Sequence, residues 1–246
     1  MAKKGQKRHQ KRLSAPAKLK LPRKTKTWTV KPAPGPHPVD ECLPLSILVR
    51  DYLRLGETRR EVNRILSDGL VQVDGRTRKD SKFPVGLMDI VRVPKADKSW
   101  RIIFDMKGYL VPYEVPKDEA EFKLARVVGK SLVKERVTQI SLHDGKTCTG
   151  DFEEINSNDV VKLNLPEVDV IDKFPFENGK PVLITGGSQV GKFGVISEDG
   201  GKDSSTNVVT IKAKDGSFQA SRDHVFVIGK KEPAISLPRW LSESNA

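Results

Sequence analysis

This sequence has no acidic residue before Asp40. Residues 1–38 carry 12 Lys and Arg, and because the whole chain has 44 basic and 32 acidic residues, the remainder is neutral. Like charges in one block repel each other, so such a block is expected to stay extended until it meets a polyanion. Nucleic acid is the most common partner of this kind, and an anionic membrane surface is the second.

Long apolar runs are also absent, since no stretch approaches the roughly 18 residues needed to span a bilayer. The basic N-terminus lacks the apolar segment of a signal peptide, and its charges do not lie opposite an apolar helical stripe. The two cysteines, Cys42 and Cys148, are too isolated for a disulfide framework or a metal site, and we expect both to be buried or half-buried. These features predict a cytoplasmic protein without a membrane partner.

Catalytic and metal-binding motifs are missing as well. No GxSxG, HExxH or CxxC pattern occurs, and His9, His37, His143 and His224 are scattered along the chain. The carboxylates are typical of solvated turns and helices. We therefore predict that the protein is not an enzyme and has no catalytic residue, cofactor, metal or small-molecule substrate.

Residues 1–38 form a predicted basic arm, in which four prolines between Pro32 and Pro38 prevent a helix and favour an extended linker. Trp28 either stacks on a base or anchors the arm to the body. We expect deletion of residues 1–26 to weaken nucleic-acid binding without unfolding the rest. The arm residues expected to contact phosphate are Lys3, Lys4, Lys7, Arg8, Lys11, Arg12, Lys18, Lys20, Arg23, Lys24 and Lys26.

Residues 43–93 have the pattern of two helices followed by a hairpin. In LPLSILVRDYLRLG the apolar residues recur at helical spacing, and Gly56 supplies a stop. Thr58 and Glu61 have the spacing of a capping box at the start of the second helix, and Gly69 ends it.

Strands are predicted to follow. LVQVDGRTR indicates a strand that runs into an Asp74-Gly75 turn, because this pair tolerates the positive φ that tight hairpins need. FPVGLMDIVRV indicates further strands with a turn at Gly86.

The second predicted helix has a basic outer face. Arg60 and Arg64 are four residues apart and therefore share a face, with Arg59 beside them. Guanidinium groups bind phosphate well because their planar donors match its oxygens. The alternative is a solvated helix face on which these arginines pair with acids such as Glu57 and Asp68.

The run LPLSILVRDYLRLGETRREVNRILSDGLVQVDGRTR resembles the S4-type RNA-binding domain, which occurs in ribosomal proteins, pseudouridine synthases and some tRNA synthetases. In that family the helix and the following hairpin form the RNA-facing surface. The resemblance implies RNA contacts by Arg59, Arg60, Asn63, Arg64 and Lys79.

The string GGSQVGK matches the spacing of a phosphate-cradling loop as far as its lysine. Phe193 stands where that loop needs Ser or Thr for Mg²⁺, and FGVI indicates a strand where it needs a helix. VLITGGSQVGKFGVI instead resembles the KOW motif, which builds an SH3-like barrel. The resemblance implies RNA contacts at Gly187 and Lys192, whereas Gly194 is expected to serve only the turn.

Taken together, the patterns predict an α+β, multi-module fold. Its expected parts are a basic arm over 1–38, an S4-type domain over 43–93, a small β-rich domain over 95–175, a KOW barrel over 176–230 and a short tail over 231–246.

This order of parts resembles the S4e family of small-subunit ribosomal proteins of archaea and eukaryotes. The strings GPHPVDECLPLSILVRDYL, FPVGLMDIV, ITGGSQVGKFGVI, HVFVIGK and ISLPR agree with it, and the short end after ISLPR points to an archaeal source. The resemblance implies a structural constituent of the small ribosomal subunit, present as a single copy and not a homo-oligomer. Its partners would be ribosomal RNA and neighbouring ribosomal proteins. The alternatives are an RNA-modifying enzyme and a KOW-type transcription factor.

Overall fold

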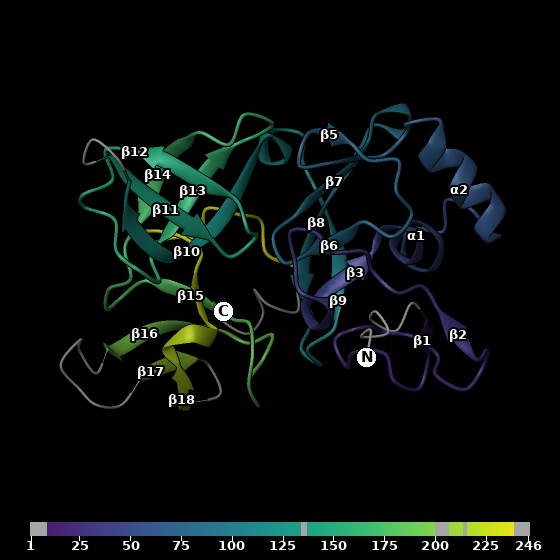
Figure 1. Cartoon of the computed structure of the whole chain (residues 1–246). Coiled ribbons are helices and arrows are strands. Elements are labelled where there is room, and N and C mark those ends of the chain that lie inside the picture. The colour runs from purple at the N-terminus through teal and green to yellow at the C-terminus, as the bar shows by residue number, and fades with distance from the viewer. Residues whose placement is uncertain (1–8, 134–136, 200–206, 214–215, 239–246) are drawn as a thin grey trace, which may run out of the picture.

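The computed structural model describes residues 9–133, 137–199, 207–213 and 216–238. Over these residues it contains mostly strands with a few short helices, which confirms the predicted mixture of the two. Figure 1 shows four parts arranged around a common centre, with α2 (Arg59–Ser67), β5 (Arg76–Thr77) and β7 (Ile90–Val93) at the upper right and strands β10–β14 (residues 122–174) at the upper left. Strands β15–β18 (within residues 181–221) lie at the lower left, and the segment with β1 (Gln10–Lys11) and β2 (Trp28–Thr29) lies at the lower right. No described helix is long and apolar enough to cross a membrane.

The second predicted helix forms as expected, as α2 over Arg59–Ser67. Thr58 Oγ1 accepts a hydrogen bond from the Glu61 N–H at 3.2 Å, and the Glu61 carboxylate accepts one from the Thr58 N–H at 3.3 Å. This reciprocal pair is the predicted capping box. The chain leaves the helix at Gly69, whose φ of +70° is easily adopted by glycine.

The first predicted helix is shorter than the sequence pattern suggests. Helix α1 spans Leu45–Ile47 and continues in wider turns as η2 over Leu48–Tyr52. It ends at Tyr52 instead of Gly56, since Arg54 has a positive φ of 54° and breaks the helical path.

The first sheet is antiparallel with the strand order β5-β4-β7-β8-β9. Its strands are β4 (Gln72–Val73), β5 (Arg76–Thr77), β7 (Ile90–Val93), β8 (Lys98–Phe104) and β9 (Leu110–Val115). The predicted Asp74-Gly75 turn joins β4 to β5, with φ values of 50° and 73°. Strands β8 and β9 had been expected in the 95–175 domain, but they extend this sheet because the tight turn η3 (Pro94–Ala96) folds β8 back on β7.

Beside the first sheet, β3 (Cys42–Pro44) pairs with β6 (Pro84–Gly86). Gly86 does not make the predicted turn, which passes through Met88 with a φ of 65°. A Cβ on Gly86 would lie 2.4 Å from the His37 ring, so glycine is needed there to admit the imidazole.

The second sheet has the order β12-β11-β10-β13-β14 and its own small hydrophobic cluster. It is preceded by the short turn η4 (Asp118–Glu121). Its strands are β10 (Phe122–Leu132), β11 (Thr138–Leu142), β12 (Thr147–Gly150), β13 (Val160–Asn164) and β14 (Val170–Phe174).

The third sheet has the order β18-β17-β16-β15-β19. Its elements are β15 (Pro181–Ile184), β16 (Phe193–Asp199), β17 (Val208–Ala213), β18 (Gly216–Ser221), the turn η6 (Arg222–His224) and β19 (Val225–Val227). Gly194 was expected to serve a turn, but it lies within β16. A Cβ there would lie 2.6 Å from Ile211 Cγ2, so this glycine allows β16 and β17 to pack closely.

The described part of the arm packs on the body, contrary to the expected extended chain. Its strands β1 (Gln10–Lys11) and β2 (Trp28–Thr29) pair, and η1 (Val39–Glu41) follows. Between the strands, Ala15, Leu19 and Leu21 enter the same hydrophobic core as the first and third sheets. Apolar side chains scattered among the lysines therefore outweigh charge repulsion, and deleting residues 1–26 would open this core instead of leaving the body intact.

Candidate nucleic-acid interface

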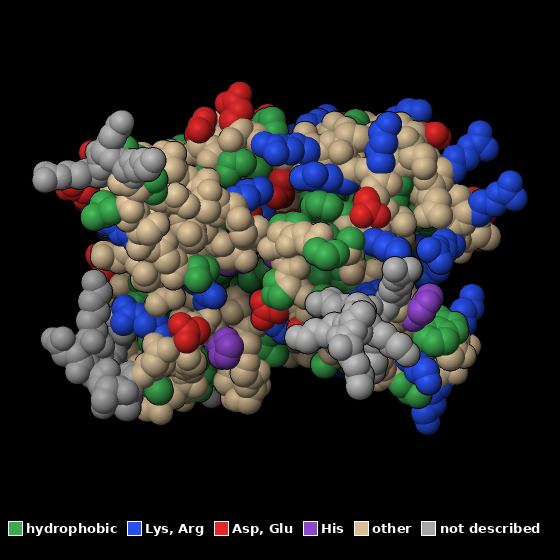
Figure 2. All heavy atoms as spheres, viewed as in Figure 1, with side chains coloured by type: hydrophobic (Ala, Val, Ile, Leu, Met, Phe, Trp, Pro, Cys, Tyr) green, Lys and Arg blue, Asp and Glu red, His purple; other side chains and the backbone are tan. Residues whose placement is uncertain are grey.

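Helix α2 carries an exposed basic face. Val62 and Leu66 are buried on the side of α2 that contacts α1 and η2, so the opposite side of the helix faces solvent. Arg59, Arg60 and Arg64 are all exposed on that helix. Figure 2 shows Lys and Arg side chains gathering along this side of the molecule, over α2 and over the region of β1 and β2.

Several of the predicted contact residues lie at the surface of the protein. Lys79 is exposed after β5, and Asn63 is half-buried on α2. In the arm, the exposed lysines are Lys11, Lys20, Lys24 and Lys26. Lys3, Lys4, Lys7 and Arg8 lie outside the described residues.

Three predicted arm contacts are instead engaged within the protein. Arg12 is buried and donates to the Pro22 carbonyl at 2.9 Å. Arg23 donates to backbone carbonyls of the arm, the shortest bond reaching Ala15 at 2.7 Å. Lys18 pairs with Glu41 at 2.8 Å. Arg12 and Arg23 hold the loop between β1 and β2 together, so their predicted role as phosphate contacts does not fit this structure.

A pocket of about 630 Å³ lies between the arm and the start of α2. It was not predicted, because its cations come from three segments that are distant in sequence. Lys31 follows β2, Arg59 begins α2 and Lys82 precedes β6. The lining residues are His9, Gln10, Trp28, Thr29, Val30, Lys31, Arg59 and Lys82.

The glycine-rich loop between β15 and β16 exposes only one of its two predicted contact residues. Gly187 is exposed with a φ of +82°, while Lys192 is half-buried with its Nζ 5.7 Å from the centre of the Phe218 ring. A Cβ on Gly191 would lie 1.9 Å from the Asp105 carbonyl oxygen. The loop therefore rests against the β8–β9 turn, and its glycines permit that close approach as well as the turn itself.

The tip of the β4–β5 hairpin, expected to face RNA, is packed against the second sheet. A Cβ on Gly75 would lie 2.9 Å from Pro166 Cβ. Asp74 is buried beside the same sheet and accepts hydrogen bonds from Lys123 at 2.9 Å and from Lys146 at 2.8 Å. Residues behind the tip, such as the exposed Lys79, remain available to a partner.

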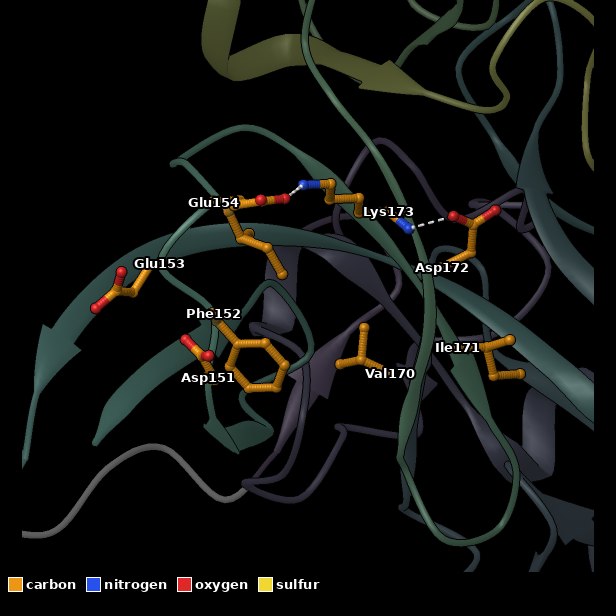
Figure 3. A pocket seen from close by; sticks show the side chains of 9 residues that line it. Asp151, Phe152, Glu153, Glu154, Val170, Ile171, Asp172 and Lys173 are labelled. Carbon is orange, nitrogen blue, oxygen red and sulfur yellow. Dashed lines mark hydrogen bonds and ion pairs between the residues drawn. The ribbon is translucent and has the colours of Figure 1, made fainter.

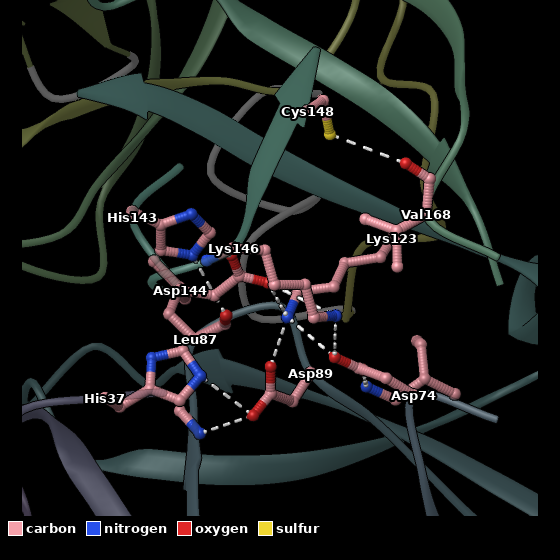
Figure 4. A network of polar contacts seen from close by, with 12 residues as sticks. His37, Asp74, Leu87, Asp89, Lys123, His143, Asp144, Lys146, Cys148 and Val168 are labelled. Atoms are coloured by element: carbon pink, nitrogen blue, oxygen red, sulfur yellow. Dashed lines mark hydrogen bonds and ion pairs between the residues drawn. The ribbon is translucent and has the colours of Figure 1, made fainter. Parts of the chain in front are cut away.

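Lys123 is the centre of a buried ionic network (Figure 4). Its side chain is fully buried and its Nζ donates to Asp74 and to Asp144, each at 2.9 Å, and to Asp89. Burial alone lowers the pKa of Lys123, but the three carboxylates outweigh it and raise that pKa. The expectation that the acids lie in solvated turns is therefore wrong for these three residues. Their partner is a lysine of the second sheet, which Asp74 and Asp89 reach from the first sheet and Asp144 from the second.

Two histidines that are distant in sequence also meet at this network (Figure 4). The ring centres of His37 and His143 are 6.0 Å apart, and His37 Nε2 lies 2.9 Å from Asp89 Oδ2. His143 accepts the Arg126 N–H through Nδ1, which leaves Nε2 to donate to the Leu87 carbonyl, as in a neutral imidazole. Burial, reinforced by the charge of Lys123, lowers the pKa of His143 to about 4.

The network is not arranged as a metal site. The ammonium group of Lys123 occupies the point between the three carboxylates where a cation would sit. Among the described residues, no group of three or more His, Cys, Asp or Glu side chains is placed to hold a metal ion. Cys42 and Cys148 are buried and unpaired, as predicted, and burial raises the pKa of the Cys42 thiol to about 12.

The second sheet carries a pocket of the opposite character, with a volume of about 410 Å³ (Figure 3). Acidic side chains border its apolar floor, and Lys173 forms an ion pair with Glu154 at its edge. The acidic lining residues are Asp151, Glu153, Glu154 and Asp172. Because these carboxylates repel phosphate, this side of the second sheet is a poor surface for nucleic acid.

Comparison with known proteins gives three family matches in the order expected from the sequence. The RS4NT domain matches residues 4–40, the S4 domain residues 44–91 and the Ribosomal family S4e residues 96–170. The small ribosomal subunit protein eS4 of Archaeoglobus fulgidus is 46% identical over 93% of this chain and 97% of its own length. That of Methanocaldococcus jannaschii is 40% identical over 96% and 100%.

The chain belongs to the S4e family of ribosomal proteins. A solved structure agrees with this assignment. The crystal structure of the 30S ribosomal protein S4e from Thermoplasma acidophilum is 34% identical to this chain, with a TM-score of 0.68. The match covers 78% of this chain and 96% of that one. The S4e resemblance inferred from the sequence motifs is confirmed.

Proposed function

We propose that this S4e-family chain is a structural constituent of the small ribosomal subunit, located in the cytoplasm, that binds ribosomal RNA. The observation that carries the proposal is the family membership, since relatives that match nearly the whole chain are named small ribosomal subunit proteins. The exposed arginines of α2 supply a physical means of binding RNA, and they lie within the segment that matches the S4 domain.

Binding would proceed by phosphate neutralisation and shape. Exposed guanidinium and ammonium groups on α2 and on the arm replace the counterions of the RNA backbone, so affinity should fall steeply with salt. The basic face would lie on RNA, while the acidic pocket of the second sheet would face away from it. The phosphate contacts proposed on this face are Lys11, Lys20, Lys24, Lys26, Arg59, Arg60, Arg64 and Lys79.

The third sheet is proposed to be a KOW-type barrel that contributes to the same RNA or to a neighbouring ribosomal protein. Support comes from its five short antiparallel strands and from the glycine-rich loop between β15 and β16. Gly187 is exposed in this loop, and Lys192 follows it. The proposed protein is a single copy per subunit that binds no small-molecule substrate.

The two alternatives have no comparable support. The relatives compared above are named as ribosomal proteins, and none of them is named as an RNA-modifying enzyme or a transcription factor. The buried carboxylates of Asp74, Asp89 and Asp144 are engaged with Lys123 in the interior.

Sedimentation of a native lysate through a sucrose gradient tests the proposal. The tagged chain should migrate with small subunits at a constant ratio to their RNA and should stay bound through moderate salt washes. Migration with RNA polymerase would support the transcription-factor alternative. Migration with free RNA, together with base modification in that RNA, would support the enzyme.

A further inference from the structure

Trp28 is 57% exposed, although the arm to which it belongs buries Ala15, Leu19 and Leu21 in the main core. Burying the Trp28 ring would contribute to stability, as the burial of these three smaller side chains does. The arm nevertheless leaves its largest apolar ring in solvent. Large exposed aromatics on a basic surface are typical of proteins that stack the bases of single-stranded nucleic acid.

The groups around Trp28 are suited to both the base and the phosphate of a nucleotide. The indole forms an apolar wall of the 630 Å³ pocket, and Arg59 and Lys82 form part of the cationic border. A nucleotide has a planar base that stacks on such a ring and a phosphate that such cations bind. A ligand with only a base would not need the adjacent charges, and a ligand with only a phosphate would not need the exposed ring.

Contacts within the arm fix the backbone position of Trp28. Trp28 is the register partner of Lys11 in the β1–β2 pair, and the Arg12 N–H donates to the Thr27 carbonyl at 3.0 Å. The buried Arg12 side chain extends this contact, with Nε 3.4 Å from the Trp28 carbonyl oxygen. Arg12 is thus a positioning residue for the backbone that carries the indole.

We propose that this pocket binds one unpaired RNA nucleotide, with its base stacked on Trp28 and its phosphate held by Arg59 and Lys82. The inference rests on the proposed function, because it specifies where the chain recognises RNA. His9 contacts Trp28 at a ring-centre distance of 5.8 Å and a tilt of 58°. Aromatic pairs in contact are about 4.5–7 Å apart, so the base stacks on the open face of the indole and not between the two rings.

The nucleotide must be unpaired for a geometric reason. In an A-form duplex both faces of each internal base are covered by its neighbours, and a protein reaches mainly 2′-hydroxyls and phosphates. A base in a loop, bulge or strand end exposes a face that an indole covers. Trp28 therefore gives the basic face a preference for folded RNA with unpaired bases over uniform duplex.

The test compares full-length variants in fluorescence anisotropy with labelled RNA. The probes are a single strand of about ten nucleotides, within the site sizes of single-strand binders, and the same strand annealed to its complement. The variants are Trp28→Ala, Trp28→Phe, Arg59→Gln and the control Leu13→Ala, which removes another exposed apolar side chain, 70% accessible, from the same arm. Circular dichroism confirms that each variant is folded.

Trp28→Ala should bind the single strand about tenfold more weakly, the size expected for one stacked base. Trp28→Phe should recover most of this loss, and Leu13→Ala should have no effect. No Trp28 variant should change duplex binding more than about twofold. Arg59→Gln should reduce the slope of log affinity against log salt by about 0.7, whereas Trp28→Ala should leave that slope unchanged.

Equal binding of the single strand by wild type and Trp28→Ala would overturn the pocket while leaving the proposed function intact. An equal loss on single strand and duplex would also overturn it, since the ring would then act through the protein fold. Failure of the wild type to bind either RNA, together with its absence from small subunits in the gradient, would instead reject the proposed function. If the wild type binds neither RNA but binds an acidic peptide, and Trp28→Ala abolishes that binding, the pocket belongs to a protein partner.

Discussion

The arginines of α2 and Lys123 of β10 carry the same charge in opposite environments. Arg59, Arg60 and Arg64 face solvent, and among the described residues no carboxylate forms an ion pair with them. Lys123 has no exposed surface and meets Asp74, Asp89 and Asp144 at once. Removing an ion from water costs several kcal/mol, so a buried lysine is tolerated only with anions around it. The α2 arginines carry no such cost and keep their charge for an external anion.

This difference separates two uses of charge that composition alone cannot distinguish. Lys123 joins the β4–β5 turn, the segment before β7 and the β11–β12 turn, so it fixes the first sheet relative to the second (Figure 4). The α2 arginines join no segments among the described residues. A substitution should therefore affect stability at the first place and RNA binding at the second.

The largest effect is expected from Lys123→Met. The substitution leaves three carboxylates buried near one another without their central cation. Removing one partner of a buried ion pair typically costs about 3–5 kcal/mol, and we expect a loss of that size in the free energy of unfolding. Urea denaturation followed by circular dichroism measures it.

Lys98→Met is the matched control, since Lys98 is an exposed strand lysine that pairs with Glu114 at 3.5 Å. It should change the free energy of unfolding by less than about 0.5 kcal/mol. If Lys123→Met unfolds at the same urea concentration as Lys98→Met, the network does not join the two sheets.

The next effect is on RNA binding by the α2 face. Replacing Arg59, Arg60 and Arg64 together with glutamine should weaken binding to small-subunit RNA roughly a hundredfold and reduce its salt slope by two to three units. Stability should hardly change, because all three side chains are exposed. Filter binding over a salt series measures both quantities.

The control for this triple variant replaces Lys95, Lys98 and Lys117 with glutamine. Lys98 and Lys117 are exposed lysines that pair with Glu114 and Asp97, so these charges are already matched within the protein. An equal loss of affinity in the control would mean that overall charge, and not the α2 face, governs binding.

A smaller effect should appear as a dependence of stability on pH. Folding lowers the pKa of His143 from 6.5 to about 4. Between these values the unfolded chain binds more protons, so the stabilisation is complete above pH 6.5 and is lost as the pH falls towards 4. The pKa of Asp144 is lowered from 3.8 to about 2, because Lys123 outweighs the effect of burial, so its stabilisation is lost only below pH 3.8.

The free energy of unfolding, measured by urea denaturation from pH 7 to pH 3, should therefore decrease in the wild type by roughly 2–3 kcal/mol between pH 7 and pH 4. In His143→Gln that part of the decrease should disappear, while the decrease below pH 3.8 remains. An unchanged pH profile in His143→Gln would show that another group titrates in this range.

The sequence predicted those elements whose causes are local. The capping box at Thr58 and Glu61 and the Asp74-Gly75 turn depend on neighbouring residues, and both are confirmed. The basic face of α2 could be predicted because a nine-residue helix fixes which side chains point outward. The family was recognisable because several such local motifs occur in a fixed order.

The sequence could not predict contacts between distant segments. Lys123 meets Asp74 and Asp144 across 49 and 21 residues, and no spacing rule links them. The same limit explains Arg12, which resembles the other cations of the arm but is buried by the loop that it holds together. The pocket at Trp28 was missed for this reason too, since α2 and the segment before β6 supply its cations.

The smallest effect distinguishes the charges of α2 from the helix that presents them. Thr58→Ala removes the hydroxyl that caps Glu61 N–H and should reduce the free energy of unfolding by about 1 kcal/mol. The arginines remain, and the folded state still places them on one face, so RNA affinity should fall less than about twofold. Thr58→Ser is the control and should retain the cap. A loss of affinity in Thr58→Ala as large as in the triple arginine variant would mean that binding depends on the precise start of α2 and not only on its exposed charge.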